Sequence, residues 1–179
     1  WGSQLAQAGV RYDLAPVADV VPASLVNVNQ PIGQLGRGYG TTSEQVSVGN
    51  TAVIRGLQQA GVASSAKHFP GIGAVSVNTD FGVAHDTVTT GSQQDLASFA
   101  AAIQSGVSSV MVSSVVYDRI DPAQPAVFSR TIVTGLLRDR LGFRGAVISD
   151  DLGAAAAVGG YPVAERGTRF LRSGGDIVL

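Results

Sequence analysis

Cysteine is absent from the sequence, which excludes disulfide bonds and metal sites built on thiolates. Charge is scarce as well. Only 14% of the residues are charged and the formal net charge is −1, so no basic surface for nucleic acid or for an anionic membrane is indicated. Long hydrophobic runs are also missing, since none approaches the ~20 apolar residues that cross a membrane.

Residue patterns for metals and cofactors are lacking too. The two histidines are not grouped with carboxylates at the spacing that metal ligands show on a helix. Residues 36–40 are rich in glycine, but they do not fit the dinucleotide-binding fingerprint. We therefore expect neither a metal nor a cofactor.

Apolar residues are plentiful, at 45% of the 179 residues, which is a globular composition with enough chain to bury a sizeable core. We treat residues 1–179 as a single domain. The first residue is Trp1 and the last, Leu179, lies in an apolar run, so we expect that segments of the domain are missing at both ends.

One pattern recurs five times along the chain. A helical stretch leads through a glycine into a short apolar run, which ends in polar or charged residues. The glycine suits the left-handed conformation at a helix end, and continuous apolar runs suit strands that are buried on both faces of a parallel sheet. The helices are expected at residues 5–8, 43–60, 92–105, 131–141 and 163–173. The strands are expected at residues 10–17, 62–66, 107–112, 146–148 and 176–179.

Alternating helices and buried strands indicate right-handed βαβ units. Five such units fit either a doubly wound sheet or part of a (β/α)₈ barrel, and periodicity does not separate the two. Each cluster of reactive side chains follows a strand, at the edge where both folds bind ligands. Residues 21–42 lack periodicity and are expected to form a long functional loop. Asp19, at the end of the first strand, is expected to brace the site.

The most specific segment is Lys-His-Phe-Pro-Gly at residues 67–71. It places a cation and an imidazole at a strand end and follows them with a Pro-Gly turn. This pentapeptide resembles the family 3 glycoside hydrolases, in particular their β-N-acetylglucosaminidase branch. The resemblance implies that Lys67 and His68 hydrogen-bond to sugar hydroxyls.

Three further segments carry the same resemblance. Residues 14–20 are similar to the family's third-strand segment, residues 37–40 to its sugar-binding arginine motif, and residues 147–152 to the segment that holds its nucleophile. The resemblance implies that Arg37 contacts the sugar. It also assigns the nucleophile to Asp150, the first of two adjacent aspartates.

The resemblance implies a (β/α)₈ TIM-type barrel, of which about five βα units are present. A complete barrel of this type takes about 250 residues. The early strands and the last strand are therefore expected to be missing from this chain.

The loop after the Lys-His motif departs from the family. Where the glucosaminidase branch carries an Asp and a His two residues apart, this sequence has Asn78 and Asp80. Three alternatives are open. Asp80 could be the general acid, as a carboxylic acid whose pKa is raised by burial near Asp150. His85 could take that role if the loop folds back. In the third alternative the acid has been lost.

The expected function is hydrolysis of a β-linked sugar, a terminal N-acetylglucosaminide by resemblance, with retention at the anomeric carbon. Peptidoglycan turnover would supply such substrates. The resemblance is compatible with a bacterial secreted, cell-envelope or cytoplasmic protein and does not choose among them. The alternative is a non-catalytic carbohydrate-binding protein on the same scaffold, which has lost the general acid histidine.

Overall fold

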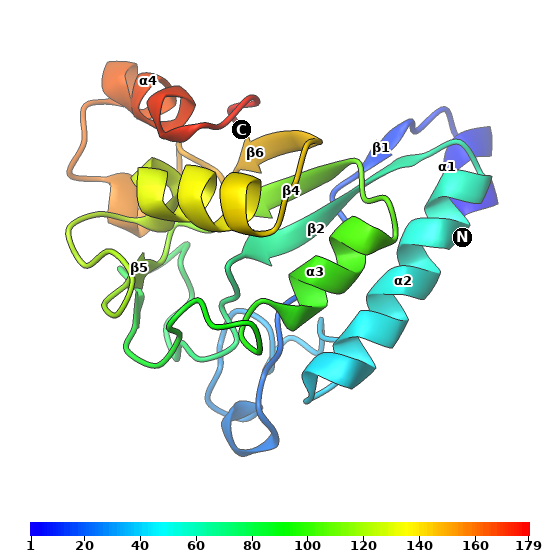
Figure 1. Cartoon of the computed structure of the whole chain (residues 1–179), viewed down its shortest axis with the longest axis horizontal. Coiled ribbons are helices and arrows are strands. Elements are labelled where there is room, and N and C mark those ends of the chain that lie inside the picture. Colours follow the sequence, from blue (N-terminus) through cyan, green and yellow to red (C-terminus); the bar gives the residue numbers. More distant parts are fainter.

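The computed structural model describes residues 1–179 as an α/β fold around a parallel sheet (Figure 1). The sheet contains four strands in the order β1-β2-β4-β6. Their bounds are β1 Tyr12–Asp13, β2 Ala63–Phe69, β4 Ser109–Val112 and β6 Ala146–Ser149. All three pairings between them are parallel.

Strand order decides between the two folds that the sequence left open. Each strand pairs with the strand that precedes it in this sheet, and a parallel bridge between Ile148 and Ile177 continues the series beyond β6. A doubly wound sheet reverses its order at a switch point, whereas a barrel adds its strands one after another. The chain therefore forms part of a (β/α)₈ barrel, as predicted.

All five expected helices are present. They are α1 (Gly2–Gln7), α2 (Ser43–Gln59), α3 (Ala97–Gln104), the π-helix η3 (Thr131–Arg140) and α4 (Val163–Ser173). The glycine that follows each helix has a positive φ angle, as predicted. These glycines are Gly9, Gly61, Gly106, Gly142 and Gly174. None of the helices combines the length and the apolarity needed to span a membrane.

The third helix begins later than the expected residue 92. The Asp95 carboxylate accepts hydrogen bonds from the backbone N–H groups of Thr90 and Ser92, and the Asp95 N–H donates to Ser92 Oγ. These short-range bonds satisfy the polar groups in a turn, so the helix starts at Ala97. The sequence pattern located this helix but not its first residue.

Short elements that the sequence did not reveal lie in the loops after the strands. A second, two-stranded parallel sheet pairs β3 with β5, and three 3₁₀ helices are present. Their bounds are β3 His85–Asp86, β5 Val116–Tyr117, η1 Ala23–Leu25, η2 Ala126–Phe128 and η4 Ala156–Val158.

The main core lies between the sheet and its helices, which cover one face in Figure 1. Phe69 of β2 meets Phe99 of α3 edge to face, with ring centroids 5.2 Å apart. The opposite face includes polar groups: Tyr12 and Ser109, on strands that flank β2, share a hydroxyl–hydroxyl hydrogen bond of 2.7 Å. This is the concave face of the partial barrel, and the carboxyl ends of its strands carry the candidate site.

Candidate active site

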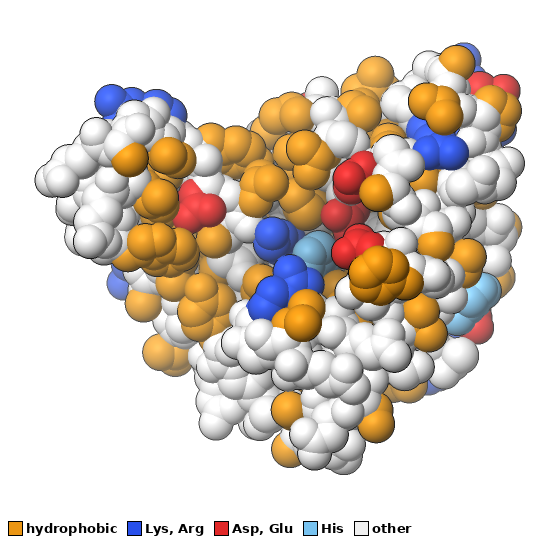
Figure 2. All heavy atoms as spheres, turned by 180° about the vertical axis from the view of Figure 1, so that it is seen from behind, with side chains coloured by type: hydrophobic (Ala, Val, Ile, Leu, Met, Phe, Trp, Pro, Cys, Tyr) orange, Lys and Arg blue, Asp and Glu red, His pale blue; other side chains and the backbone are white.

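Charged groups from distant parts of the chain gather around Lys67 at the end of β2. The pKa of the Lys67 ammonium is lowered, first by burial and then by the positive charge of Arg37, while Asp150 and Asp19 act in the opposite direction. Figure 2 shows basic, imidazole and acidic side chains together in a hollow of the surface. The fold thus brings together Lys67, Arg37 and Asp150, which are three of the residues that the sequence nominated.

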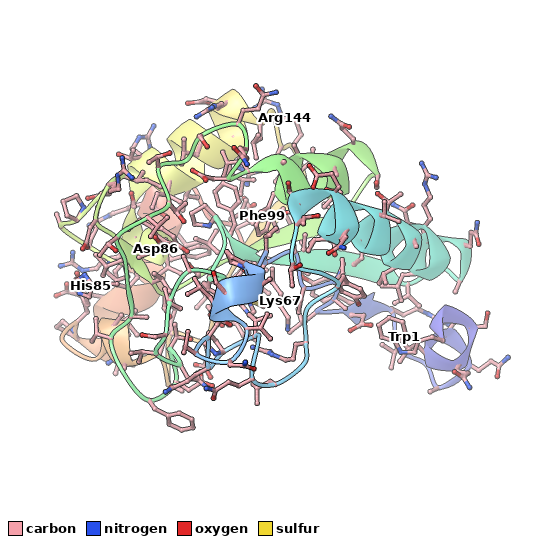
Figure 3. The ribbon with its side chains drawn as sticks, turned by 90° about the horizontal axis from the view of Figure 1, so that it is seen from below. Trp1, Lys67, His85, Asp86, Phe99 and Arg144 are labelled. Carbon is pink, nitrogen blue, oxygen red and sulfur yellow. The ribbon has the colours of Figure 1, made fainter.

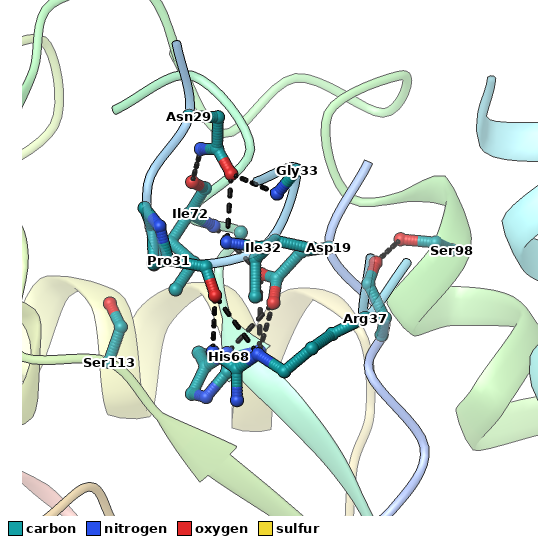
Figure 4. Close-up of polar contacts among 12 residues, drawn as sticks. Asp19, Asn29, Pro31, Ile32, Gly33, Arg37, His68, Ile72, Ser98 and Ser113 are labelled. Carbon is teal, nitrogen blue, oxygen red and sulfur yellow. Dashed lines mark hydrogen bonds and ion pairs between the residues drawn. The ribbon is translucent and has the colours of Figure 1, made fainter. Parts of the chain in front are cut away.

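His68 is held by Asp19, a fully buried carboxylate (Figure 4). His68 Nδ1 lies 2.8 Å from Asp19 Oδ2, and the backbone N–H of Ile72 donates to Asp19 Oδ1 at 2.8 Å. Because a carboxylate can only accept, Nδ1 must carry the proton, which leaves Nε2 for a ligand. The expected bracing role of Asp19 is confirmed by these bonds.

Arg37 lies on the irregular segment between β1 and α2. Its Nε donates to the carbonyl of Pro31 at 3.0 Å, and one terminal nitrogen donates to the same oxygen (Figure 4). Nearby, Tyr39 packs so closely on Gly49 of α2 that a Cβ at Gly49 would lie 2.8 Å from the Tyr39 Cβ. The two bonds to Pro31 hold the guanidinium on one side, and its remaining N–H groups can bind a ligand.

The two adjacent aspartates after β6 have different surroundings. Asp151 Oδ1 accepts hydrogen bonds from the N–H groups of Gly153 and Ala154, at 2.6 and 2.9 Å, so this carboxylate holds a turn. Asp150 continues the sheet through its N–H, which donates to the carbonyl of Val112 at 2.9 Å. Its own carboxylate accepts one bond, from the Asp151 N–H. Asp150 therefore has the more available carboxylate at the strand end.

Asp80 is exposed, so the burial that the first alternative required is not found. Its segment nevertheless contacts the loop that follows the nucleophile candidate. The carbonyl of Thr79 accepts a hydrogen bond of 3.0 Å from the N–H of Ala156, which lies in the loop that follows Asp150. The expectation of a buried Asp80 is wrong because the turn at residues 78–82 faces outward, with Phe81 86% exposed.

His85 is not brought to the strand ends. It lies in β3, where pairing with Val116 fixes its position, and its Nδ1 is 2.8 Å from Asp118 Oδ1. Its side chain is 52% exposed. Figure 3 shows His85 at one edge of the molecule, well apart from Lys67. The loop does not fold back in the way that a catalytic His85 would need.

Asn29 was not singled out from the sequence, although it connects two loops of the site. Its Nδ2 donates to the carbonyls of Ile72 and Val75 at 2.9 and 2.7 Å, and its Oδ1 accepts from the N–H groups of Ile32 and Gly33. Figure 4 shows this fully buried side chain between the loops. The only signal in the sequence was an asparagine in a loop without periodicity. Asparagines are so common in loops that this signal did not indicate a role for Asn29.

Comparisons with known proteins match the whole chain. The family model described as "Glycosyl hydrolase family 3 N terminal domain" matches residues 1–179. A β-hexosaminidase of Xanthomonas oryzae pv. oryzae is 36% identical, with 99% of this chain and 51% of that protein covered. The chain thus spans about half the length of the curated relatives it matches.

Two solved structures are similar over the same extent. The β-N-acetylhexosaminidase from Beutenbergia cavernae has a TM-score of 0.97 and 43% identity, with 100% of this chain and 54% of that chain covered. A glycoside hydrolase family 3 β-N-acetylglucosaminidase from Paenibacillus has a TM-score of 0.87 and 32% identity, with 99% and 34% covered. By sequence and by fold, the chain belongs to the glycosyl hydrolase family 3 N-terminal domain family.

Proposed function

We propose that this protein hydrolyses a terminal β-linked N-acetylglucosaminide with retention of anomeric configuration. The observation that carries the proposal is the available carboxylate of Asp150 at a strand end, close enough to Lys67 to influence the pKa of its ammonium, which Arg37 also influences. The names of the similar proteins support the substrate class. Peptidoglycan fragments are a source of such sugars that fits this class.

Sugar binding falls to Arg37, Lys67 and His68. Sugar hydroxyls need partners in fixed places. Arg37 and Lys67 present N–H donors, and His68 presents Nε2 as an acceptor, each from a position held by the sheet or by hydrogen bonds. The guanidinium and the ammonium make charge-assisted hydrogen bonds, which are stronger than neutral ones. Together they would hold the non-reducing sugar with its anomeric carbon toward Asp150.

In the first chemical step, Asp150 attacks the anomeric carbon and the bond to the leaving oxygen breaks. Asp80 is exposed in the free protein, so the bound substrate must cover its carboxyl to keep it protonated. The protonated Asp80 then donates its proton to that oxygen, so the aglycone leaves as an alcohol. In the second step Asp80, now a carboxylate, takes a proton from water as the water displaces Asp150. The contact between Thr79 and Ala156 supports this role, because it docks the Asp80 segment on the loop that follows the nucleophile.

A non-catalytic sugar-binding protein is the second candidate. Two observations favour it: Asn78 and Asp80 stand where the family branch has its Asp and His, and Asp80 is exposed. Arg37, Lys67 and His68 would bind a sugar equally well without an acid. Binding and cleavage must therefore be measured separately.

The deciding experiment is hydrolysis of a panel of p-nitrophenyl β-glycosides by the complete gene product, beside Asp150→Asn and Asp118→Asn. We expect cleavage of the N-acetylglucosaminide, and Asp150→Asn should lower kcat on the order of 10⁴-fold because the nucleophile is lost. The exposed Asp118 serves as a remote carboxylate control and should leave kcat unchanged. Binding of N-acetylglucosamine without any cleavage by the wild type would instead establish the sugar-binding candidate.

A further inference from the structure

Residues 72–82, which carry Asp80, contain neither helix nor strand. Inside this segment, the N–H groups of Phe81 and Gly82 both donate to the carbonyl of Asn78, forming one turn. A single turn does not orient a segment relative to the rest of the barrel. The position of the Asp80 carboxyl therefore depends on contacts that come from other loops.

The base of the segment is tied down by Asn29, whose amide donates to the carbonyls of Ile72 and Val75. These two bonds use both N–H groups of the Asn29 amide. Its Oδ1 accepts two further bonds, from the N–H groups of Ile32 and Gly33, which lie on its own segment. Residues 72–75 are consequently fixed to the irregular segment between β1 and α2, residues 14–42, which we call the Arg37 segment because it carries Arg37. The turn with Asp80 lies beyond this point and needs a second tie.

Gln30, the next residue, supplies that second tie. Its side-chain Oε1 accepts a hydrogen bond of 3.1 Å from the backbone N–H of Asn78. The Asn78 side chain in turn accepts a bond of 3.0 Å from the N–H of Asp80. Two consecutive hydrogen bonds thus connect the Gln30 amide with the backbone of Asp80.

From the opposite side, the carbonyl of Thr79 accepts the N–H of Ala156, and Thr79 itself is buried. The turn is therefore held between the Arg37 segment and the loop that follows Asp150. Gln30 differs from the other ties because its side chain is exposed. Its removal would leave neither a cavity nor a buried unpaired group, so its effect on stability is small.

We propose that Gln30 is a positioning residue for Asp80: its amide holds the turn so that the Asp80 carboxyl reaches the glycosidic oxygen. This inference rests on the proposed function. Gln30 and Arg37 belong to the same segment. The segment that binds the sugar through Arg37 therefore also positions Asp80 through Gln30. A displacement of about 1 Å at such a group lowers the rate by up to about 10²-fold.

The test compares Gln30→Ala with the matched control Gln34→Ala in the complete gene product. Gln34 is also exposed and lies on the same segment, but its amide donates to Asn27 and does not reach the Asp80 segment. Two substrates are used. The methyl β-N-acetylglucosaminide needs a proton on its leaving oxygen, whereas the 2,4-dinitrophenyl β-N-acetylglucosaminide has a stable leaving group and needs none.

We expect Gln30→Ala to lower kcat/KM about tenfold on the methyl glycoside and less than about twofold on the dinitrophenyl glycoside. Gln34→Ala should leave both values within about twofold of the wild type. Equal losses on the two substrates, or no loss on either, would overturn the role of Gln30 while the hydrolase proposal stands. A wild type that cleaves neither substrate would overturn the hydrolase proposal and the role of Gln30 with it.

Discussion

Lys67 and His68 belong to strand β2, whereas Asp80 belongs to a segment without helix or strand. Lys67 is positioned by a parallel bridge to Val17, and His68 by the buried Asp19. Asp80 is positioned by hydrogen bonds between loops, from Gln30 and Ala156. Lys67 and His68 therefore cannot move without disturbing the sheet, while the Asp80 segment can change with little cost to the fold. The Asp80 segment is also the part of the candidate site in which the sequence departs from the pattern of the resembling family branch.

Removal of the proposed acid, Asp80, should lower kcat/KM more than any other substitution considered below. We expect Asp80→Asn to lower kcat/KM for the methyl β-N-acetylglucosaminide by about 10²–10⁴-fold, because no proton reaches the leaving oxygen. The dinitrophenyl glycoside should be affected far less, and the melting temperature should stay unchanged because Asp80 is exposed. Comparable kcat/KM losses on both substrates would show that Asp80 is not the acid.

A substitution at Asp19, which holds His68, should lower the stability of the fold instead. Asp19→Ala leaves the N–H groups of His68 and Ile72 and the His68 ring nitrogen without their acceptor inside the protein. We expect the free energy of unfolding to fall by about 3 kcal/mol in urea denaturation. Asp19→Asn keeps one acceptor oxygen and should lose less. A loss below about 1 kcal/mol for Asp19→Ala would contradict the bracing role.

Sugar binding should depend on pH through Lys67. Burial, reinforced by the positive charge of Arg37, lowers the pKa of the Lys67 ammonium, so this donor loses its proton at a lower pH than an ordinary lysine does. We expect the affinity for N-acetylglucosamine to fall about tenfold as pH rises through this lowered pKa. Isothermal titration calorimetry with N-acetylglucosamine at a series of alkaline pH values measures this affinity. In Lys67→Arg the cation does not titrate, so this fall should disappear.

The smallest effect is expected at His85, which forms an exposed pair with Asp118 away from Lys67. His85→Ala should change kcat/KM by less than about twofold and the free energy of unfolding by less than about 1 kcal/mol. Steady-state kinetics and thermal denaturation measure both quantities. A large loss of activity in a normally folded variant would restore His85 as the acid and remove Asp80 from that role.

Much of the site followed from local sequence alone. The alternation of helices, glycines and apolar runs located all five helices, and it placed Lys67, His68 and Asp150 at the carboxyl ends of strands. These features are local, because helix periodicity, strand burial and glycine φ angles depend on residues within a few positions of each other. The start of α3 was missed because the side-chain bonds of Asp95 replace the expected first turn.

Only the tertiary structure decided the strand order, the exposure of Asp80 and the place of His85. It also joined Asn29 to residues 43 and 46 positions further along the chain. Each of these depends on which distant segments meet, and hydrogen bonds between loops leave no periodic trace in a sequence. The sequence by itself determined the βα units and the side chains at their strand ends. The contacts that hold the Asp80 segment exist only once the chain has folded.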